Sequence, residues 1–148
     1  MNNGCFILCE NCKKETIYIK KSENNCFYCK KKIVVDSKIE GLVVALNFCG
    51  IKTSSSCQGH SSGFGDSRWS FPCIVLSKEN NNIEKAELLV KKYNEKQEKK
   101  GGSEWSIVAH KFMQKHERIL VPKDKGKGLK ELWEEVDIFA RYITGFFF

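Results

Sequence analysis

Apolar residues recur at helical spacing in three segments of the chain. These segments lie at 39–46, at about 83–99 and at 129–143. The apolar stripe of the third segment comprises Leu129, Leu132, Trp133, Val136, Ala140 and Ile143. Polar residues at 36–37 can cap the first segment and Gly50 can end it. The pattern therefore predicts three amphipathic helices, each with one face in the core.

Shorter apolar runs between and before these segments predict strands. They lie at 16–19, at 72–76, and at 105–112 and 118–121, the last two joined near 114–115. The late pair suits an antiparallel hairpin. Strands interleaved with helices predict an α+β fold, in which a small mixed or antiparallel sheet packs with about three helices.

The length of 148 residues, of which 41% are hydrophobic, suffices for one substantial core. No run approaches the roughly 18 consecutive apolar residues of a membrane span. The first five residues lack the basic and apolar regions of a signal peptide. We therefore expect a soluble, cytoplasmic protein with no membrane partner.

Four of the eight cysteines form a pattern with a chemical meaning. Cys9 and Cys12 are separated by two residues, as are Cys26 and Cys29, and thirteen residues lie between the two pairs. This spacing lets each pair direct two thiolates at one ion, while the intervening chain turns back to bring the pairs together. The pattern resembles zinc-ribbon and rubredoxin-type modules over residues 9–29.

We expect these cysteines to hold one structural Zn²⁺ ion, because a filled shell of four thiolates leaves no open position for catalysis. The expected reducing environment favours metal binding over disulfides. Iron, or a disulfide arrangement, is the alternative. Residues 1–35 are accordingly predicted to form a zinc ribbon and residues 36–148 an α+β domain.

A second group of reactive residue types lies at 51–71, which looks like a strand end that runs into an irregular loop. Its members are Thr53, Cys57, Gly59, His60, Arg68 and Trp69. In one interpretation, Cys57 is a nucleophile, His60 is its base and Arg68 binds an anionic substrate, because a cysteine needs a basic neighbour to become a thiolate.

Two other interpretations of this loop stay open. Cys57 and His60 could bind a second metal ion with a further ligand. The candidates for that ligand are Cys49, Cys73 and His110. Alternatively, the loop is a hydrogen-bonded turn in which Gly59 meets a backbone requirement and Cys57 is buried.

The same loop resembles part of a known family, the wybutosine-synthesis methyltransferases, which act on a hypermodified guanosine in tRNA. The residues that carry the resemblance are Thr53, Ser55, Ser56, Cys57, Gly59, Trp105 and His110. The family has Ser-Ser-Cys-Ser-Gly-Arg where this chain has Gln58 and His60 in the fourth and sixth places. The resemblance covers residues 47–60 and 105–110. It implies a related α+β fold with a substrate site near Cys57, Gly59, His60 and His110.

The net charge of +7 favours anionic partners such as nucleic acid. Residues 1–35 contain seven Lys and three Glu, although four thiolates and one Zn²⁺ would together add −2 there. The candidate nucleic-acid contacts are Lys13, Lys14, Lys30, Lys31 and Lys32, the aromatic residues Phe27 and Tyr28, and Lys123, Lys125 and Lys127 on a glycine-rich loop.

We therefore predict a zinc-ribbon protein that binds nucleic acid, RNA rather than DNA. One alternative is an enzyme that modifies RNA or a nucleotide with the Cys57 and His60 loop. Its substrate contacts would be Thr53, Gly59, Arg68 and Trp69. A second alternative is an inhibitor or adaptor that meets a protein partner through the zinc arm or the C-terminal helix.

Overall fold

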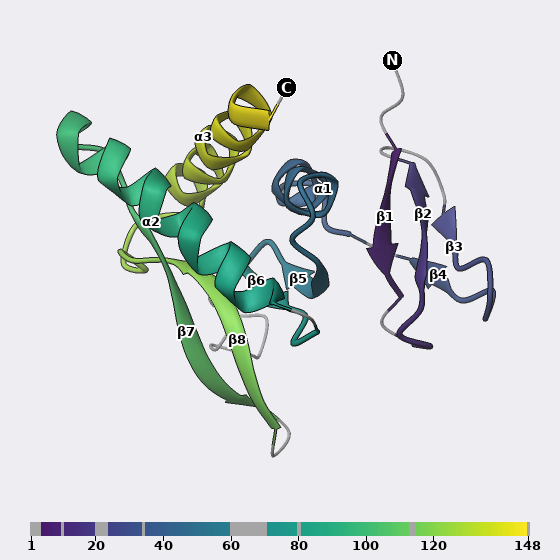
Figure 1. Ribbon diagram of the computed structural model, residues 1–148. Helices are drawn as coiled ribbons and strands as arrows, with labels where there is room; N and C mark the ends of the chain where they lie inside the picture. Colours follow the sequence, from purple (N-terminus) through teal and green to yellow (C-terminus); the bar gives the residue numbers. More distant parts are fainter. Residues whose placement is uncertain are drawn as a thin grey trace.

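The computed structural model describes residues 4–9, 11–19, 24–33, 35–59, 71–79, 81–112 and 115–147. Within these ranges the chain has the predicted α+β fold (Figure 1). The elements are β1 (Gly4–Leu8), β2 (Glu15–Ile19), β3 (Asn24–Asn25), β4 (Lys32–Ile33), α1 (Glu40–Phe48), β5 (Thr53–Cys57), β6 (Cys73–Leu76), α2 (Asn82–Lys100), β7 (Trp105–Phe112), β8 (Lys115–Pro122) and α3 (Leu129–Phe147).

The central sheet has the strand order β5-β6-β8-β7, and every neighbouring pair is antiparallel. The predicted hairpin is present, but β8 begins at Lys115 rather than at Arg118. Its ladder with β7 continues from the pair Trp105 and Pro122 to the pair Phe112 and Lys115. The hairpin therefore projects beyond the shorter β5 and β6, as Figure 1 shows.

The three helices share one core with one face of this sheet. Leu42 of α1, Tyr93 of α2 and Phe139 of α3 are buried together with Ile74 of β6 and Trp105 of β7. The Tyr93 and Phe139 rings stack with their centroids 4.3 Å apart. The predicted helical stripes thus form the core. None of the helices, in the residues that the structure describes, could span a lipid bilayer.

The start of α1 differs from the predicted cap at residues 36–37. Ile39 occupies the N-cap position, and no side chain caps the helix there. The Asp36 carbonyl accepts the Ile39 N–H in a preceding turn, at 3.1 Å. The Asp36 carboxylate instead accepts the backbone N–H of Gln58 at 3.1 Å. The Asp36 side chain, which the sequence predicted as a helix cap, therefore binds the backbone of Gln58 instead.

The strand β5 is polar, with the sequence Thr-Ser-Ser-Ser-Cys, and buried asparagines hold the chain where it begins. Asn47 donates its amide to the Thr53 hydroxyl at 2.9 Å. Asn82 accepts the Lys52 N–H at 2.6 Å and donates to the Lys52 carbonyl at 2.8 Å. These bonds satisfy buried polar groups that would otherwise destabilise a polar edge strand.

The N-terminal arm, residues 4–33, consists of two hairpins, β1–β2 and β3–β4. The strand β1 was not predicted. Ile7 and Tyr18 are buried against Val44 of α1. Tyr18 also donates a hydrogen bond to Glu40, and Lys52 forms an ion pair with Glu15 of β2. The arm is therefore attached to the rest of the molecule by apolar and polar contacts, beside α1 in Figure 1.

Candidate metal centre

Each cysteine pair lies in the turn of its own hairpin, and the two turns have the same backbone. In the first turn, the Cys9 N–H donates to the Lys14 carbonyl at 2.9 Å, and the Lys13 N–H donates to the Cys9 carbonyl at 2.9 Å. The second turn repeats both bonds at equivalent positions, at 2.9 and 3.0 Å. Lys13 and Lys30 both adopt the left-handed conformation, with φ of 65° and 64°. Two copies of one turn thus face each other.

The four sulfur atoms meet between these turns. The Cys9 and Cys29 sulfurs are 3.7 Å apart, the Cys12 and Cys26 sulfurs are 3.5 Å apart, and all four lie within 4.8 Å of one another. Tetrahedral Zn–S bonds of about 2.3 Å place sulfurs about 3.8 Å apart, whereas a disulfide needs about 2.05 Å. The predicted four-cysteine cluster is confirmed, and its spacing fits zinc.

Polar donors directed at the sulfurs stabilise the thiolate form that binds a metal. The Asn11 side chain and the backbone N–H of Lys31 lower the pKa of the Cys29 thiol to about 6. At Cys12, the Lys14 N–H also lowers the pKa, but burial and the neighbouring thiols outweigh it and raise the pKa to about 11. A divalent cation bound here would supply the charge that keeps all four sulfurs deprotonated. Asn11 was not predicted, although its place inside the first turn could have indicated it.

The left-handed Lys13 offers a stability test. This conformation costs a residue with a Cβ about 1–2 kcal/mol, and glycine avoids that cost. We expect Lys13→Gly to stabilise the metal-bound arm by about 1 kcal/mol, which corresponds to about fivefold tighter zinc binding. Competition with a coloured chelator measures the affinity. Lys13→Ala removes the same charge but keeps the Cβ, so it should show no gain; equal affinities of the two variants would contradict the prediction.

Gln58, directly after β5, joins the end of this strand to the turn before α1 and to α3, and Gly59 follows it. The Gln58 side-chain oxygen accepts the Lys38 N–H at 3.1 Å, and the Gln58 backbone carbonyl accepts the Trp133 indole N–H at 2.8 Å. Gly59 has a φ of +93°, and a Cβ there would lie 2.7 Å from Leu129 Cδ2 and 2.9 Å from the Phe71 carbonyl carbon. Glycine is therefore required at this position by the backbone and by its neighbours.

The Cys57 thiol is half-buried beside this turn. Its sulfur accepts the Gly59 N–H at 3.4 Å. Burial, and to a smaller extent the Asp36 carboxylate, raises the pKa of Cys57. The directly opposite Cys73 on β6 is buried, which raises its pKa to about 12. Both thiols are therefore protonated at neutral pH, and a protonated thiol is a weak nucleophile.

Several residues of the predicted catalytic loop lie outside the described part of the chain: His60, Arg68 and Trp69. His110 lies on β7 opposite Glu117, but its side chain is not described. Their convergence on Cys57 stays a prediction. Within the described ranges, the four-cysteine cluster is the only group of three or more His, Cys, Asp or Glu side chains that could hold a metal ion. The half-buried Cys49 donates its thiol to the Leu46 carbonyl at 3.2 Å.

The lysines of the glycine-rich loop contact other parts of the fold. Lys123 forms an ion pair with Glu104 at 3.1 Å. Lys127 forms one with Glu135 at 3.2 Å and donates to the Ser103 hydroxyl at 2.7 Å. The Lys125 ammonium lies 5.3 Å from the centre of the Phe71 ring. Carboxylates therefore offset two of the three positive charges proposed for nucleic-acid contact.

Comparisons of the chain with family models, with curated proteins and with solved structures found no match. The cluster of four cysteines on two β-hairpins is consistent with a zinc-ribbon module. Of the residues that carry the resemblance to the wybutosine-synthesis methyltransferases, Thr53, Ser55, Ser56, Cys57, Gly59 and Trp105 are described, and the His110 side chain is not.

Proposed function

We propose that the arm holds one structural Zn²⁺ ion and binds single-stranded nucleic acid, RNA in preference to DNA. The observation that carries this proposal is the aromatic pair between the last two cysteines. Phe27 is 72% exposed and Tyr28 is 54% exposed. Their rings meet edge to face, with centroids 5.4 Å apart. Because the metal fixes this turn, the two rings form a platform on which unpaired bases can stack.

Two lysines place positive charge beside the platform. The Lys14 ammonium lies 4.8 Å from the centre of the Tyr28 ring, and the Lys30 ammonium lies 5.0 Å from the centre of the Phe27 ring. Lys30 also donates to the Phe27 carbonyl at 2.8 Å. A strand that stacks its bases on these rings brings its phosphates within reach of both charges.

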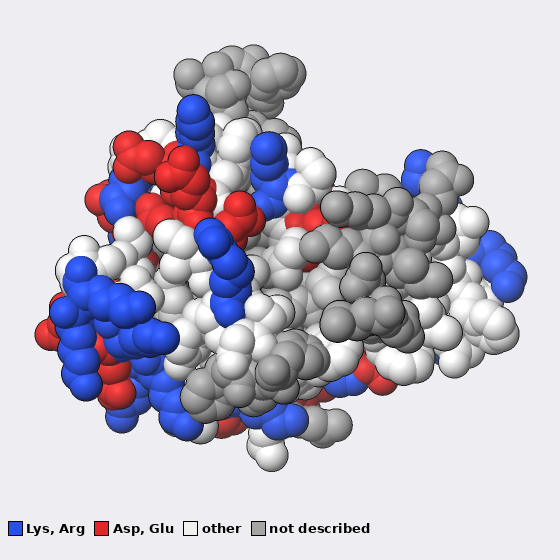
Figure 2. Space-filling model, turned by 90° about the horizontal axis from the view of Figure 1, so that it is seen from above, with Lys and Arg blue, Asp and Glu red and all other residues white. Residues whose placement is uncertain are grey.

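Positive charge also lies away from the arm on the face that Figure 2 shows. Figure 2 shows Lys and Arg side chains in several separate groups on the face seen from above, with acidic side chains among them. Such a face contributes general attraction to an anionic strand, which salt screens. The aromatic turn, rather than a broad basic surface, therefore supports the choice of ligand.

Removal of both rings tests the proposal. The double variant Phe27→Ala, Tyr28→Ala should bind single-stranded RNA about 10- to 100-fold more weakly, because stacking contributes about 1–3 kcal/mol per base. Fluorescence anisotropy with a short labelled RNA and the zinc-loaded protein measures the affinity. Phe6→Ala is the matched control, since it removes a 61% exposed ring from β1, and it should leave the affinity unchanged.

Salt dependence and metal content complete this experiment. The affinity should fall as salt rises, because lysines that contact phosphates release counterions. Equal zinc content of all variants would show that the arm is intact. The proposal would be wrong if the zinc-loaded protein did not bind the RNA at about 50 mM salt, or if Phe6→Ala and the double variant lost the same affinity.

A further inference from the structure

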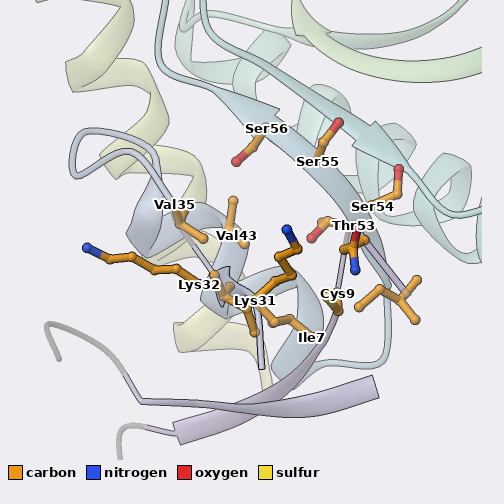
Figure 3. Close-up of a pocket in the computed structure, with 13 residues that line it drawn as sticks. Ile7, Cys9, Lys31, Lys32, Val35, Val43, Thr53, Ser54, Ser55 and Ser56 are labelled. Carbon is orange, nitrogen blue, oxygen red and sulfur yellow. The ribbon is translucent and has the colours of Figure 1, made fainter. Parts of the chain in front are cut away.

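A pocket of about 480 Å³ lies between the arm and the edge of the central sheet. Its wall combines the end of β1, Cys9 and Asn11 of the first cysteine turn, residues 31–33 and 35, Val43 of α1, and residues 53–56 of β5 (Figure 3). No strand in the described part of the chain pairs with the outer edge of β5, although β1 lies near it. The volume falls in the range of about 300–1,000 Å³ that is typical of small-molecule sites.

A bulge in β5 brings two hydroxyl groups to this pocket. Thr53 pairs with Leu76, but Ser55 pairs with Val75 and Ser56 with Ile74, so Ser54 is the extra residue. The extra residue shifts the alternation of side chains. Thr53 and Ser56 therefore share the face of the sheet that borders α1, and in Figure 3 both hydroxyls point into the pocket while Ser55 points away.

The pocket has positive charge on one side and apolar surface on another. Figure 3 shows the Lys31 side chain directed at β5. No Asp or Glu lines the pocket in the described residues, although Cys9 of the four-cysteine cluster does. Ile7, Val35 and Val43 supply apolar wall. The Thr53 hydroxyl accepts the Asn47 amide at 2.9 Å, which leaves its own proton available for donation.

We propose that this pocket binds the phosphate end of a nucleotide. Lys31 pairs with the phosphate, Ser56 and Thr53 donate to its oxygens, and the apolar wall contacts the sugar or the base. The choice of ligand rests on the proposed function: Lys30, the residue before Lys31, contacts the aromatic platform. The nucleotide is either a free mononucleotide or the phosphorylated end of a strand that lies on the platform.

Calorimetry on the zinc-loaded full chain tests the pocket with adenosine monophosphate, adenosine and inorganic phosphate. Adenosine monophosphate should bind at least about tenfold more tightly than adenosine, because charge-assisted hydrogen bonds to the phosphate contribute most of the affinity. Lys31→Met should weaken it about tenfold and Ser56→Ala about fivefold. Lys99→Met, which removes the same charge from the exposed end of α2, is the matched control and should have little effect.

Short RNA strands with and without a terminal phosphate separate the two sources. If the terminal phosphate tightens strand binding about tenfold and Lys31→Met loses this gain, the ligand of the pocket is the end of a strand. If the terminal phosphate gives no gain but the mononucleotide binds tightly, the ligand is a free nucleotide. The inference is overturned if no phosphorylated ligand binds more tightly than its phosphate-free counterpart, or if Lys31→Met and Lys99→Met act equally. If RNA binding still depends on Phe27 and Tyr28, the proposed function remains supported even when this inference is overturned. Loss of that dependence would remove the proposed function instead.

Discussion

Removal of the metal will unfold the arm while the central sheet and helices stay folded. Apart from the contacts of Ile7, Tyr18 and Glu15 with the rest of the molecule, the arm has little to hold its two hairpins in place, since β3 and β4 have two residues each. Zinc binding contributes about 10–16 kcal/mol to the folding of comparable peptides. Cys26→Ser, which removes a buried ligand, should therefore lose the metal and the arm together. Amide hydrogen exchange with and without chelator measures which residues lose protection.

The control for this experiment is Cys49→Ser, because Cys49 is half-buried at the C-terminal end of α1 and is not part of the four-cysteine cluster. It should keep one equivalent of zinc. Elemental analysis of the purified protein gives the identity and amount of the metal. Iron in place of zinc, an amount far below one equivalent, or unchanged exchange in the arm after chelation would contradict the prediction.

Gly59→Ala should destabilise the protein by about 3 kcal/mol. The new Cβ would cost about 1–2 kcal/mol for the left-handed backbone and about 1–3 kcal/mol for overpacking. One of the two atoms that it meets, the Phe71 carbonyl carbon at 2.9 Å, belongs to the backbone. That backbone cannot move freely, since Cys73 is paired with Cys57 only two residues later. Urea denaturation measures the free energy of unfolding.

Gly50→Ala is the matched control for this substitution. Gly50 has the same φ of +93°, but a Cβ there would meet no atom within 4 Å. It should cost only the backbone term, about 1–2 kcal/mol. The difference between the two variants therefore measures the clash with Phe71 and Leu129. Equal losses would show that the neighbours of Gly59 move aside at no cost, contrary to the prediction.

The helices and the metal cluster could be predicted because their signals are local. Apolar residues three and four positions apart share one face of a helix wherever that helix lies, so the stripe through Leu132 and Val136 predicted a buried face. The two-residue spacing of each cysteine pair likewise specifies a turn that directs both sulfurs at one point. The sequence did not indicate that each pair has its own hairpin, because β1 and the two-residue strands carry little pattern of their own.

The polar strand β5 could not be predicted in the same way. Its serines have no apolar alternation, and its position depends on Asn47 and Asn82, which hold its start, and on Gln58, which joins its end to α3. The pairing of Lys123 with Glu104 and of Lys127 with Glu135 also depends on how the loop is folded against β7 and α3. The net charge of the sequence suggests that these lysines are available to bind an anionic partner, whereas ion pairs in the folded protein partly neutralise them.

The sequence by itself determined the three helices, the α+β class and the four metal ligands, since neighbours along the chain suffice to specify each. Only the tertiary structure decided where the arm lies, which lysines are paired, and that a bulge at Ser54 turns Thr53 and Ser56 toward Lys31. The physical reason is that these features arise from hydrogen bonds and contacts between different elements of the fold. The separation of two residues along the sequence does not show whether their side chains meet in the folded protein.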